Sequence, residues 1–495
     1  MQLNLSHVTY AYSGSKSPAV TDVTATFPAG WTGLIGDNGC GKSTLARISV
    51  HLIEPDSGTV GPKLYSAYCE QDSTQAPENI FDLASDWSQE ALRVKSLLGI
   101  EDDWLWRFES LSGGQQKRLQ IACALHLRPD VLVMDEPTND LDGETRGAVK
   151  RALASFKGVG ILISHDRDLL DDLVRQSLVF DGRSWTMRPG GYSKASAQAA
   201  SERESALRDR ENAAREAGRI KAEAQRRSEE AARQKAKRSK RRLGKGDSDA
   251  REKIGRAIVS GKDGVAGKLS SSMGKRLEKA EDALAGKRVS KRYDGRIGEY
   301  GQAARSSFVA HMGATELHSG DFSIMVPKVW ISPTDHIVLT GANGTGKSLV
   351  VRNVMGAIPD TIKAAYVPQE VDSKERERAL SLLRSLSQDQ RGQVLSIVAR
   401  LNSDPDKVLD GNDLSPGELR KVMLAEQLVA QPNFLVLDEP ANHLDVGSIE
   451  ALQDLLLGFP GAFLLVTHDR QLADAVAEIE WKTLRIEGKI HLKTD

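Results

Sequence analysis

Two segments of the chain have the spacing of a phosphate-binding loop, Gly-x-x-x-x-Gly-Lys-Ser, at residues 36–43 and 341–348. Glycines in such a loop let backbone N–H groups close on phosphate oxygens, and the lysine reaches the β- and γ-phosphates. The serine hydroxyl can ligate Mg²⁺. The candidate nucleotide-binding residues are Gly36, Asn38, Gly39, Gly41, Lys42, Ser43 and Thr44, and in the second segment Gly341, Asn343, Gly344, Gly346, Lys347 and Ser348.

An apolar run that ends in two acids follows each loop. Residues 131–134 lead to Asp135 and Glu136, and residues 434–437 lead to Asp438 and Glu439. Such a run is typical of a strand buried on both faces, which presents the acids at its carboxyl end. The two aspartates are then placed to hold Mg²⁺, and the two glutamates to orient or deprotonate an attacking water.

A histidine follows each acid pair at the same distance. His165 and His468 each lie 29 residues beyond the glutamate. A lone histidine is usually structural, but its repetition at equal spacing favours a catalytic role. The loop serines are 305 residues apart, while the acids and the histidines are 303 apart. The chain therefore contains two copies of one unit.

A third repeated segment lies between the loop and the acids, reading Leu-Ser-Gly-Gly-Gln at 111–115 and Leu-Ser-Pro-Gly-Glu at 414–418. In both copies a serine is followed by Gln or Glu three residues later, which fits a capping box, so we expect a helix to begin there. The free N–H groups of a helix N-terminus suit a γ-phosphate. The candidate residues are Ser112, Gly113, Gly114 and Gln115, and in the second copy Ser415, Gly417 and Glu418.

This order of motifs resembles the ATP-binding cassette superfamily, and the resemblance covers most of both terminal regions. It implies an α/β core with a helical subdomain in each copy, and it implies that Gln71 and Gln369 are the glutamine-loop residues, which contact ATP and Mg²⁺. It also implies that two cassettes close head to tail, so that each ATP lies between one phosphate loop and the opposite signature. The implied Mg²⁺ ligands are Ser43, Gln71 and Asp135, and in the second copy Ser348, Gln369 and Asp438.

Two positions make the copies unequal. Tyr12 fits, by resemblance, the place of an aromatic residue that stacks on adenine, although a strand-end tyrosine is about equally compatible; the matching region near Leu317 and His318 has no aromatic residue. Pro416 replaces a glycine of the signature and lacks an N–H that a phosphate could use. We expect the site of Lys42 with the Ser415 signature to bind or cleave ATP more weakly than the other site.

Composition limits the class of protein. A length of 495 residues corresponds to about three domains. Three cysteines, Cys40, Cys69 and Cys123, are too few for a disulfide framework and favour a reducing compartment. The sequence has neither an apolar run of about 18 residues nor an N-terminal signal segment, so we expect a cytoplasmic protein that is not exported and does not span a membrane.

The middle of the chain is strongly basic. Residues 194–296 contain 30 basic and 16 acidic residues, a net charge of +14, against −15 for the rest. Residues 194–242 lack proline and are rich in helix formers, and glycines between 243 and 268 should break the helix. Met273, Leu277, Ala280 and Leu284 then have the spacing of a seam in an antiparallel coiled-coil hairpin.

This charge fits a phosphate-rich partner better than a solvated linker, because it is of one sign toward the tip. Tyr293 is the only aromatic residue of the segment, which favours contact with a nucleic-acid backbone over stacking on bases. The basic residues that gather toward the tip, and the candidate nucleic-acid contacts, are Lys235, Lys237, Arg238, Lys240, Arg241 and Arg242.

Two cassettes, no membrane domain and a basic helical linker resemble the ABC-F subfamily, over the whole chain. The resemblance implies a monomer that closes on itself, with cassettes at 1–193 and 301–495. It implies that residues 194–300 enter the tRNA exit site of the ribosome, touching peptidyl-site tRNA and ribosomal RNA, to regulate translation or to dislodge an antibiotic. Asp140 and Ala441 each depart from the subfamily motif Asp-Glu-Pro-Thr-Asn-His-Leu-Asp. The alternatives are the ATPase subunit of a transporter with separate membrane chains, and a nucleic-acid remodelling ATPase unrelated to the ribosome.

Overall fold

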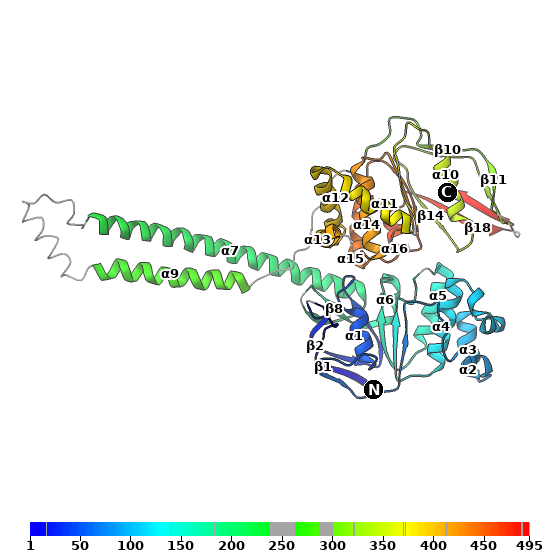
Figure 1. Cartoon of the computed structure of the whole chain (residues 1–495), viewed down its shortest axis with the longest axis horizontal. Coiled ribbons are helices and arrows are strands. Elements are labelled where there is room, and N and C mark those ends of the chain that lie inside the picture. The colour runs from blue at the N-terminus through cyan, green and yellow to red at the C-terminus, as the bar shows by residue number, and fades with distance from the viewer. Residues whose placement is uncertain are drawn as a thin grey trace, which may run out of the picture. The chain divides into compact units, whose positions relative to one another are not determined.

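The computed structural model describes the chain except residues 16, 140, 183, 238–262, 287–299, 320–321, 370, 372, 411–413, 487–488 and 495. The chain divides into two compact units. One unit contains both cassettes, Met1–Ala195 and Arg292–Asp495, and the other is Ser196–Lys291. Figure 1 shows the course of the chain. Among the described helices, none is long and apolar enough to cross a membrane.

The first cassette is built on a six-stranded sheet in which all neighbouring strands are parallel except the last pair. In sheet order the strands are β5 (Ser66–Cys69), β6 (Val131–Asp135), β7 (Val159–Ile163), β3 (Gly30–Ile35), β8 (Val174–Phe180) and β9 (Trp185–Pro189). Every residue of β6 is buried, as its apolar run predicts, and the neighbouring strand β7 is also buried along its whole length. A second, antiparallel sheet contains β2 (Val20–Pro28), β1 (Gln2–Tyr10) and β4 (Ser57–Gly61).

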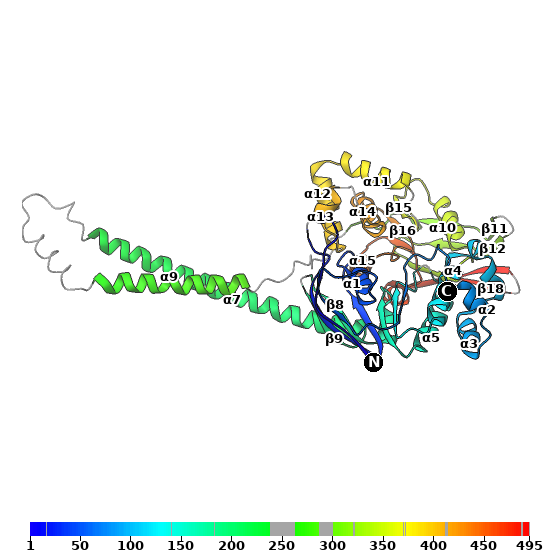
Figure 2. The same ribbon diagram turned by 60° about the horizontal axis from the view of Figure 1, so that its bottom comes forward.

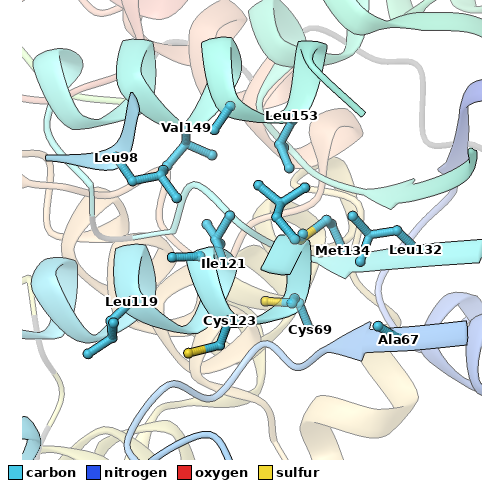
Figure 3. Packing of buried hydrophobic residues seen from close by; sticks show 14 of the residues in the cluster. Ala67, Cys69, Leu98, Leu119, Ile121, Cys123, Leu132, Met134, Val149 and Leu153 are labelled. Atoms are coloured by element: carbon cyan, nitrogen blue, oxygen red, sulfur yellow. The ribbon is translucent and has the colours of Figure 1, made fainter. Parts of the chain in front are cut away.

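Helices complete this cassette and cover the apolar faces. Figure 3 shows Ile121 and Cys123 of helix α4 close to Met134 and Leu132 of β6, with Val149 and Leu153 of helix α5 nearby. All three cysteines are free thiols. The helical elements are α1 (Lys42–Ser49), α2 (Ile80–Ser85), α3 (Gln89–Leu98), the 3₁₀ turns η1 (Asp102–Trp106) and η2 (Phe108–Ser110), α4 (Gly113–His126), α5 (Gly143–Ala154) and α6 (Arg167–Leu173).

The second cassette repeats this arrangement with one larger sheet of eight strands. In sheet order they are β11 (Thr315–Ser319), β12 (Phe322–Val326), β19 (Lys489–Thr494), β18 (Ile479–Ile486), β14 (His336–Gly341), β17 (Ala462–Val466), β16 (Phe434–Asp438) and β15 (Ala364–Val367). A separate pair is β10 (Ala310–Met312) with β13 (Val329–Ile331). The helices are α10 (Lys347–Gly356), α11 (Ser373–Ser385), α12 (Gln388–Arg400), α13 (Pro405–Asp410), α14 (Pro416–Val429), α15 (Val446–Leu457) and α16 (Arg470–Val476). The predicted α/β fold class with two cassettes is confirmed.

Between the cassettes, the described part of the basic segment consists of two helices, α7 (Tyr192–Lys237) and α9 (Asp263–Gly286), which run side by side in both views (Figures 1 and 2). Met273 of α9 is buried, and Leu277, Ala280 and Leu284 are half-buried, so the predicted seam is confirmed. On α7, Ala217 and Ile220 are buried. The helix break ends earlier than expected, because residues 263–268 already belong to α9 despite their glycines.

The basic tip is only partly described. Lys235 and Lys237 belong to the last turn of α7, but their side chains are not described. Arg238, Lys240, Arg241 and Arg242 lie outside the described residues. Nearer the start of α7, acids and bases pair at i,i+4 spacing as expected, with Glu204–Arg208 at 2.5 Å and Glu223–Arg227 at 2.7 Å.

We expect Met273→Asp to open the two-helix segment, because burying a carboxylate at the seam removes it from water at a large cost in free energy. Limited proteolysis with trypsin should then cleave α7 and α9 about tenfold faster than in the wild type. Ser272→Asp is the matched control, since the adjacent side chain is exposed. Equal acceleration by both substitutions would contradict the seam.

A second prediction concerns Glu426 on α14, whose Oε1 accepts no hydrogen bond from the described residues. Burial raises the pKa of this carboxyl from 4.5 to about 8. The folded state therefore keeps the proton that the unfolded chain loses, and stability should fall as the pH rises from about 5 to 8. Glu426→Gln, which is neutral throughout, should raise the melting temperature at pH 8 by about 2–4 °C and change it little at pH 5.

Thermal unfolding at the two pH values measures the effect of Glu426→Gln. The exposed Glu377 on α11 provides the control substitution, Glu377→Gln. A gain from Glu426→Gln that is the same at pH 5 and pH 8 would show that the raised pKa is not its cause.

Candidate nucleotide-binding sites

Both phosphate loops connect the end of a central strand to the start of a helix. The first runs from β3 to α1 and the second from β14 to α10, so the helix N-termini face the loops. Gly41 and Gly346 cap the two helices in the left-handed conformation, with φ of 96° and 85°. A Cβ on Gly41 would lie 2.3 Å from the carbonyl oxygen of Ala19. Only glycine satisfies both constraints.

The loop lysines are buried and turned back along their own loops. Lys42 Nζ donates to Gly36 O at 2.8 Å and to Asp37 O at 3.1 Å. Lys347 Nζ donates to Gly341 O at 3.0 Å and also lies 3.0 Å from His468 Nε2. Each ammonium group therefore lies inside its loop, among the groups expected to bind phosphate.

The acid pairs stand at the carboxyl ends of the buried strands, as predicted. Asp135 ends β6 and Asp438 ends β16, and both are buried. Burial raises the pKa of Asp438, although the positive charges of Lys347 and Arg352 partly lower it again. A buried carboxylate of this kind is stabilised by a nearby cation.

Glu136 and Glu439 share an unusual geometry. Both are buried, and both have the left-handed backbone conformation, with φ of 49° and 48°. Such a φ is uncommon outside glycine and is found at functional sites. Within the described residues, one carboxylate oxygen of each, Oε1, accepts no hydrogen bond although the histidine Nε2 is only 3.2 Å away in the first copy and 3.4 Å in the second.

The histidines hold the other oxygen of each glutamate. The backbone N–H of His165 donates to Glu136 Oε2 and that of His468 to Glu439 Oε2, each at 3.2 Å. Burial raises the pKa of Glu136 to about 8 and that of Glu439 to about 7. Burial also lowers the pKa of both histidines to about 3, so their rings are neutral at pH 7. A carboxyl with a pKa near neutrality is suited to general-base chemistry.

The signature segments begin helices, as the capping boxes predict. Ser112 caps α4 and Ser415 caps α14, and each serine exchanges hydrogen bonds with Gln115 or Glu418. Pro416 is the first residue of α14, which confirms its expected position. The helix N-terminus of the second signature therefore lacks one N–H.

The glutamine loops are held by the signature helices through their backbones. Lys117 Nζ of α4 donates to Glu70 O at 2.5 Å and to Gln71 O at 3.2 Å. Arg420, the equivalent residue of α14, donates to Gln369 O. In the described part of the chain, no hydrogen bond joins the side chain of Gln71 or Gln369 to the acid pairs.

Hydrogen bonds also join the two cassettes beside the phosphate loops. Asn38 Nδ2 donates to His443 O at 3.0 Å, and Asn343 N donates to Asp142 Oδ2 at 3.1 Å. His443 and Asp142 both lie between an acid pair and the helix that follows it. Each phosphate loop thus contacts the opposite cassette.

Tyr12, the predicted adenine-stacking residue, lies beside the first phosphate loop, where its hydroxyl is 3.1 Å from Thr44 Oγ1.

Two other aromatic residues lie near the sites but are not among the residues predicted from the sequence. Tyr68 donates a hydrogen bond to Asp135 Oδ2 at 2.6 Å. The sequence does mark this tyrosine, because Tyr68 and Tyr366 each lie three residues before the glutamine of their glutamine loop. Phe322 packs against Gly346, where an added Cβ would lie 2.8 Å from the ring. Only the folded backbone brings Phe322 to this loop.

Comparison with known proteins agrees with these sites. The family model described as "ABC transporter" matches residues 20–139 and 327–442, which contain both phosphate loops and both acid pairs. Solved structures support the same fold. The archaeal ribosome recycling factor aABCE1, solved in complex with the stalk protein aP1, gives a TM-score of 0.63 at 19% identity over 98% of this chain and 89% of that chain.

Two relatives align over almost the whole chain. The chain is 28% identical over 539 residues to the tylosin resistance ATP-binding protein TlrC of Streptomyces fradiae, with 95% of each protein covered. It is 26% identical over 518 residues to the energy-dependent translational throttle protein EttA of Escherichia coli (strain K12), which covers 91% of this chain and 86% of that protein. With two cassettes, both sets of nucleotide motifs and a helical segment between them, the chain belongs to the ABC-F subfamily of ATP-binding cassette proteins and is an ATPase.

Proposed function

We propose that this ATPase binds the ribosome while its cassettes hold ATP and leaves after ATP cleavage. In this proposal residues 194–300 touch ribosomal RNA and peptidyl-site tRNA, and the result is regulation of translation or protection from an antibiotic. The observation that carries the proposal is the net charge of +14 on residues 194–296, in a chain whose remainder carries −15. A phosphate-rich surface is the partner that this charge fits.

The relatives support this direction. TlrC is named for tylosin resistance and EttA for throttling translation, and both align with more than nine tenths of the chain. The free thiols agree with a cytoplasmic location, which we also propose.

In the proposed mechanism each cassette binds the phosphates of ATP at the N-terminus of α1 or α10. Lys42 and Lys347 exchange loop carbonyls for phosphate oxygens, and the helix N-terminus adds positive potential. Tyr12 supports the adenine in the first site. The described residues contain no cluster of three or more His, Cys, Asp or Glu side chains that would form a metal cage. This agrees with Mg²⁺, which usually binds one or two carboxylates together with substrate phosphates.

We infer that Ser43, Gln71 and Asp135 hold Mg²⁺ in the first site, and that Ser348, Gln369 and Asp438 hold it in the second. Bound Mg²⁺ would neutralise charge on the phosphates. Glu136 and Glu439 orient and deprotonate the attacking water through the carboxylate oxygen that accepts no hydrogen bond from the described residues. The neutral histidines fix these glutamates through their backbone N–H groups.

Closure of the monomer on itself would complete both sites. Each γ-phosphate would then lie between a phosphate loop and the opposite signature helix, so that ATP holds the cassettes together and cleavage releases them. The contacts of Asn38 and Asn343 with the opposite cassette support this pairing.

Ribosome binding is tested with the variant Glu136→Gln, Glu439→Gln, which should hold ATP without cleaving it. We expect this variant to co-sediment with ribosomes in ATP at low salt and to be released as salt rises, because charge-driven contacts release counterions. If it remains in the supernatant at low salt, the ribosomal proposal is wrong.

The role of the basic tip is tested in the same variant. Reversing Lys235 and Lys237 to glutamate should weaken co-sedimentation by about tenfold at physiological salt. Reversing Arg219 and Lys221, two exposed residues of α7 farther from the tip in sequence, is the matched control. Equal losses would place the contact elsewhere on the segment.

Unequal sites are tested by single-turnover ATP cleavage. We expect Glu136→Gln, which leaves the second site active, to cleave ATP about five- to tenfold faster than Glu439→Gln, because the first site faces Pro416 and lacks one N–H donor. Adding Pro416→Gly should raise the rate of Glu439→Gln and leave that of Glu136→Gln unchanged. Equal residual rates in the two single variants would rule out this asymmetry.

A further inference from the structure

Arg146 is a residue of the first cassette that contacts the second ATP site. It lies in the first turn of α5, and its side chain is 21% exposed. Its Nη1 donates to the backbone carbonyl of His468 at 3.1 Å. The sequence motifs do not include this arginine.

The same guanidinium group also contacts two loops of its own cassette. Its Nε donates to Leu141 O at 2.9 Å, and Nη1 lies 3.9 Å from Asp166 Oδ2, beside His165. The planar guanidinium group carries five donors and can hold several acceptors at fixed angles, which a lysine cannot do. Arg146 thus links the loop after the first acid pair to the histidine loops of both cassettes.

The residue that Arg146 holds lies within the second site. His468 Nε2 is 3.0 Å from Lys347 Nζ and 3.0 Å from Asn343 Oδ1, both in the second phosphate loop. Its backbone N–H holds the carboxylate of Glu439. A shift of the His468 backbone would therefore move both the base and a contact of the phosphate loop.

The second cassette has no arginine at the equivalent position. The residue equivalent to Arg146, at the repeat distance of 303, is Ile449. Ile449 is 3% exposed and packs in the apolar core of the second cassette. An isoleucine cannot donate a hydrogen bond to the carbonyl of His165.

We propose that Arg146 is a positioning residue for the second ATP site, which holds His468 from the opposite cassette and makes cleavage there depend on the first cassette. The dependence runs in one direction only, because Ile449 of the second cassette cannot make the corresponding hydrogen bond to the first. This inference rests on the proposed function of Glu439 and His468 in ATP cleavage. It is independent of Pro416, which belongs to the other composite site.

The test uses Arg146→Ile, which introduces the residue found at the equivalent position of the second cassette. This substitution is combined separately with Glu136→Gln and with Glu439→Gln. In Glu136→Gln only the second site is active, and we expect single-turnover cleavage to fall about tenfold, as for the loss of a charge-assisted hydrogen bond. The KM for ATP should change less than twofold, since the phosphate loop keeps its own contacts. In Glu439→Gln, where only the first site is active, the rate should stay within twofold. Equal loss in both backgrounds, or no loss in Glu136→Gln, would overturn the proposal.

Two further variants separate positioning from general stability. Gln471→Ala removes another hydrogen bond between the cassettes, from Gln471 Nε2 to Asp168 Oδ1 at 2.5 Å, and should slow the two backgrounds equally or not at all. Arg146→Lys should restore part of the rate in Glu136→Gln, because it keeps one cationic donor. If Arg146→Ile does not fold, Arg146→Gln is scored by the same criteria. The double variant Glu136→Gln, Glu439→Gln tests the proposed function separately. If it cleaves ATP as fast as the wild type, the proposed catalytic glutamates are wrong, and the positioning role of Arg146 that rests on them is wrong as well.

Discussion

Each proposed ATP site of this protein contains a glutamate carboxylate that is kept out of water. Glu136 and Glu439 follow strands that are buried along their whole length, and both are themselves buried. Burial raises the pKa values of these glutamates toward neutrality, which suits their proposed role as general bases. Both glutamates have a left-handed backbone and accept a hydrogen bond from the histidine loop, and each follows a strand inside a parallel sheet. The order of strands β6 and β7, and of β16 and β17, supplies these conditions.

Duplication of the cassette has not produced two equal sites. Pro416 removes one N–H from the signature that faces the first phosphate loop in the proposed closed state. Arg146 supports the histidine of the second site, whereas its counterpart Ile449 is a core residue. In the proposed mechanism both differences favour cleavage at the second site, although they act through different groups. In the proposed function the protein binds its partner only while ATP is intact. A slow first site would then prolong this binding, and a fast second site would begin the release.

The two-helix segment follows a different physical rule from the cassettes. Its seam is narrow, with small residues such as Ala217 on α7 and larger ones such as Met273 on α9, and most of its other side chains are exposed. Its helices are also supported by pairs of opposite charge along α7. Such a segment has no large core and exposes most of its side chains along two long helices.

The sequence alone determined the features that depend on local order. The phosphate loops, the buried acid strands, the capping boxes at Ser112 and Ser415 and the seam at Met273 all follow from residue type and spacing, because each leaves its pattern within a short stretch of sequence. The glycines at 264 and 267 predict a longer helix break than the structure has, since α9 already includes both. The contacts of Phe322 with Gly346, of Tyr68 with Asp135 and of Arg146 with His468 were decided only by tertiary structure. They join residues 24 to 322 positions apart, and no local pattern encodes which side chains a folded sheet and a second cassette bring within hydrogen-bonding distance.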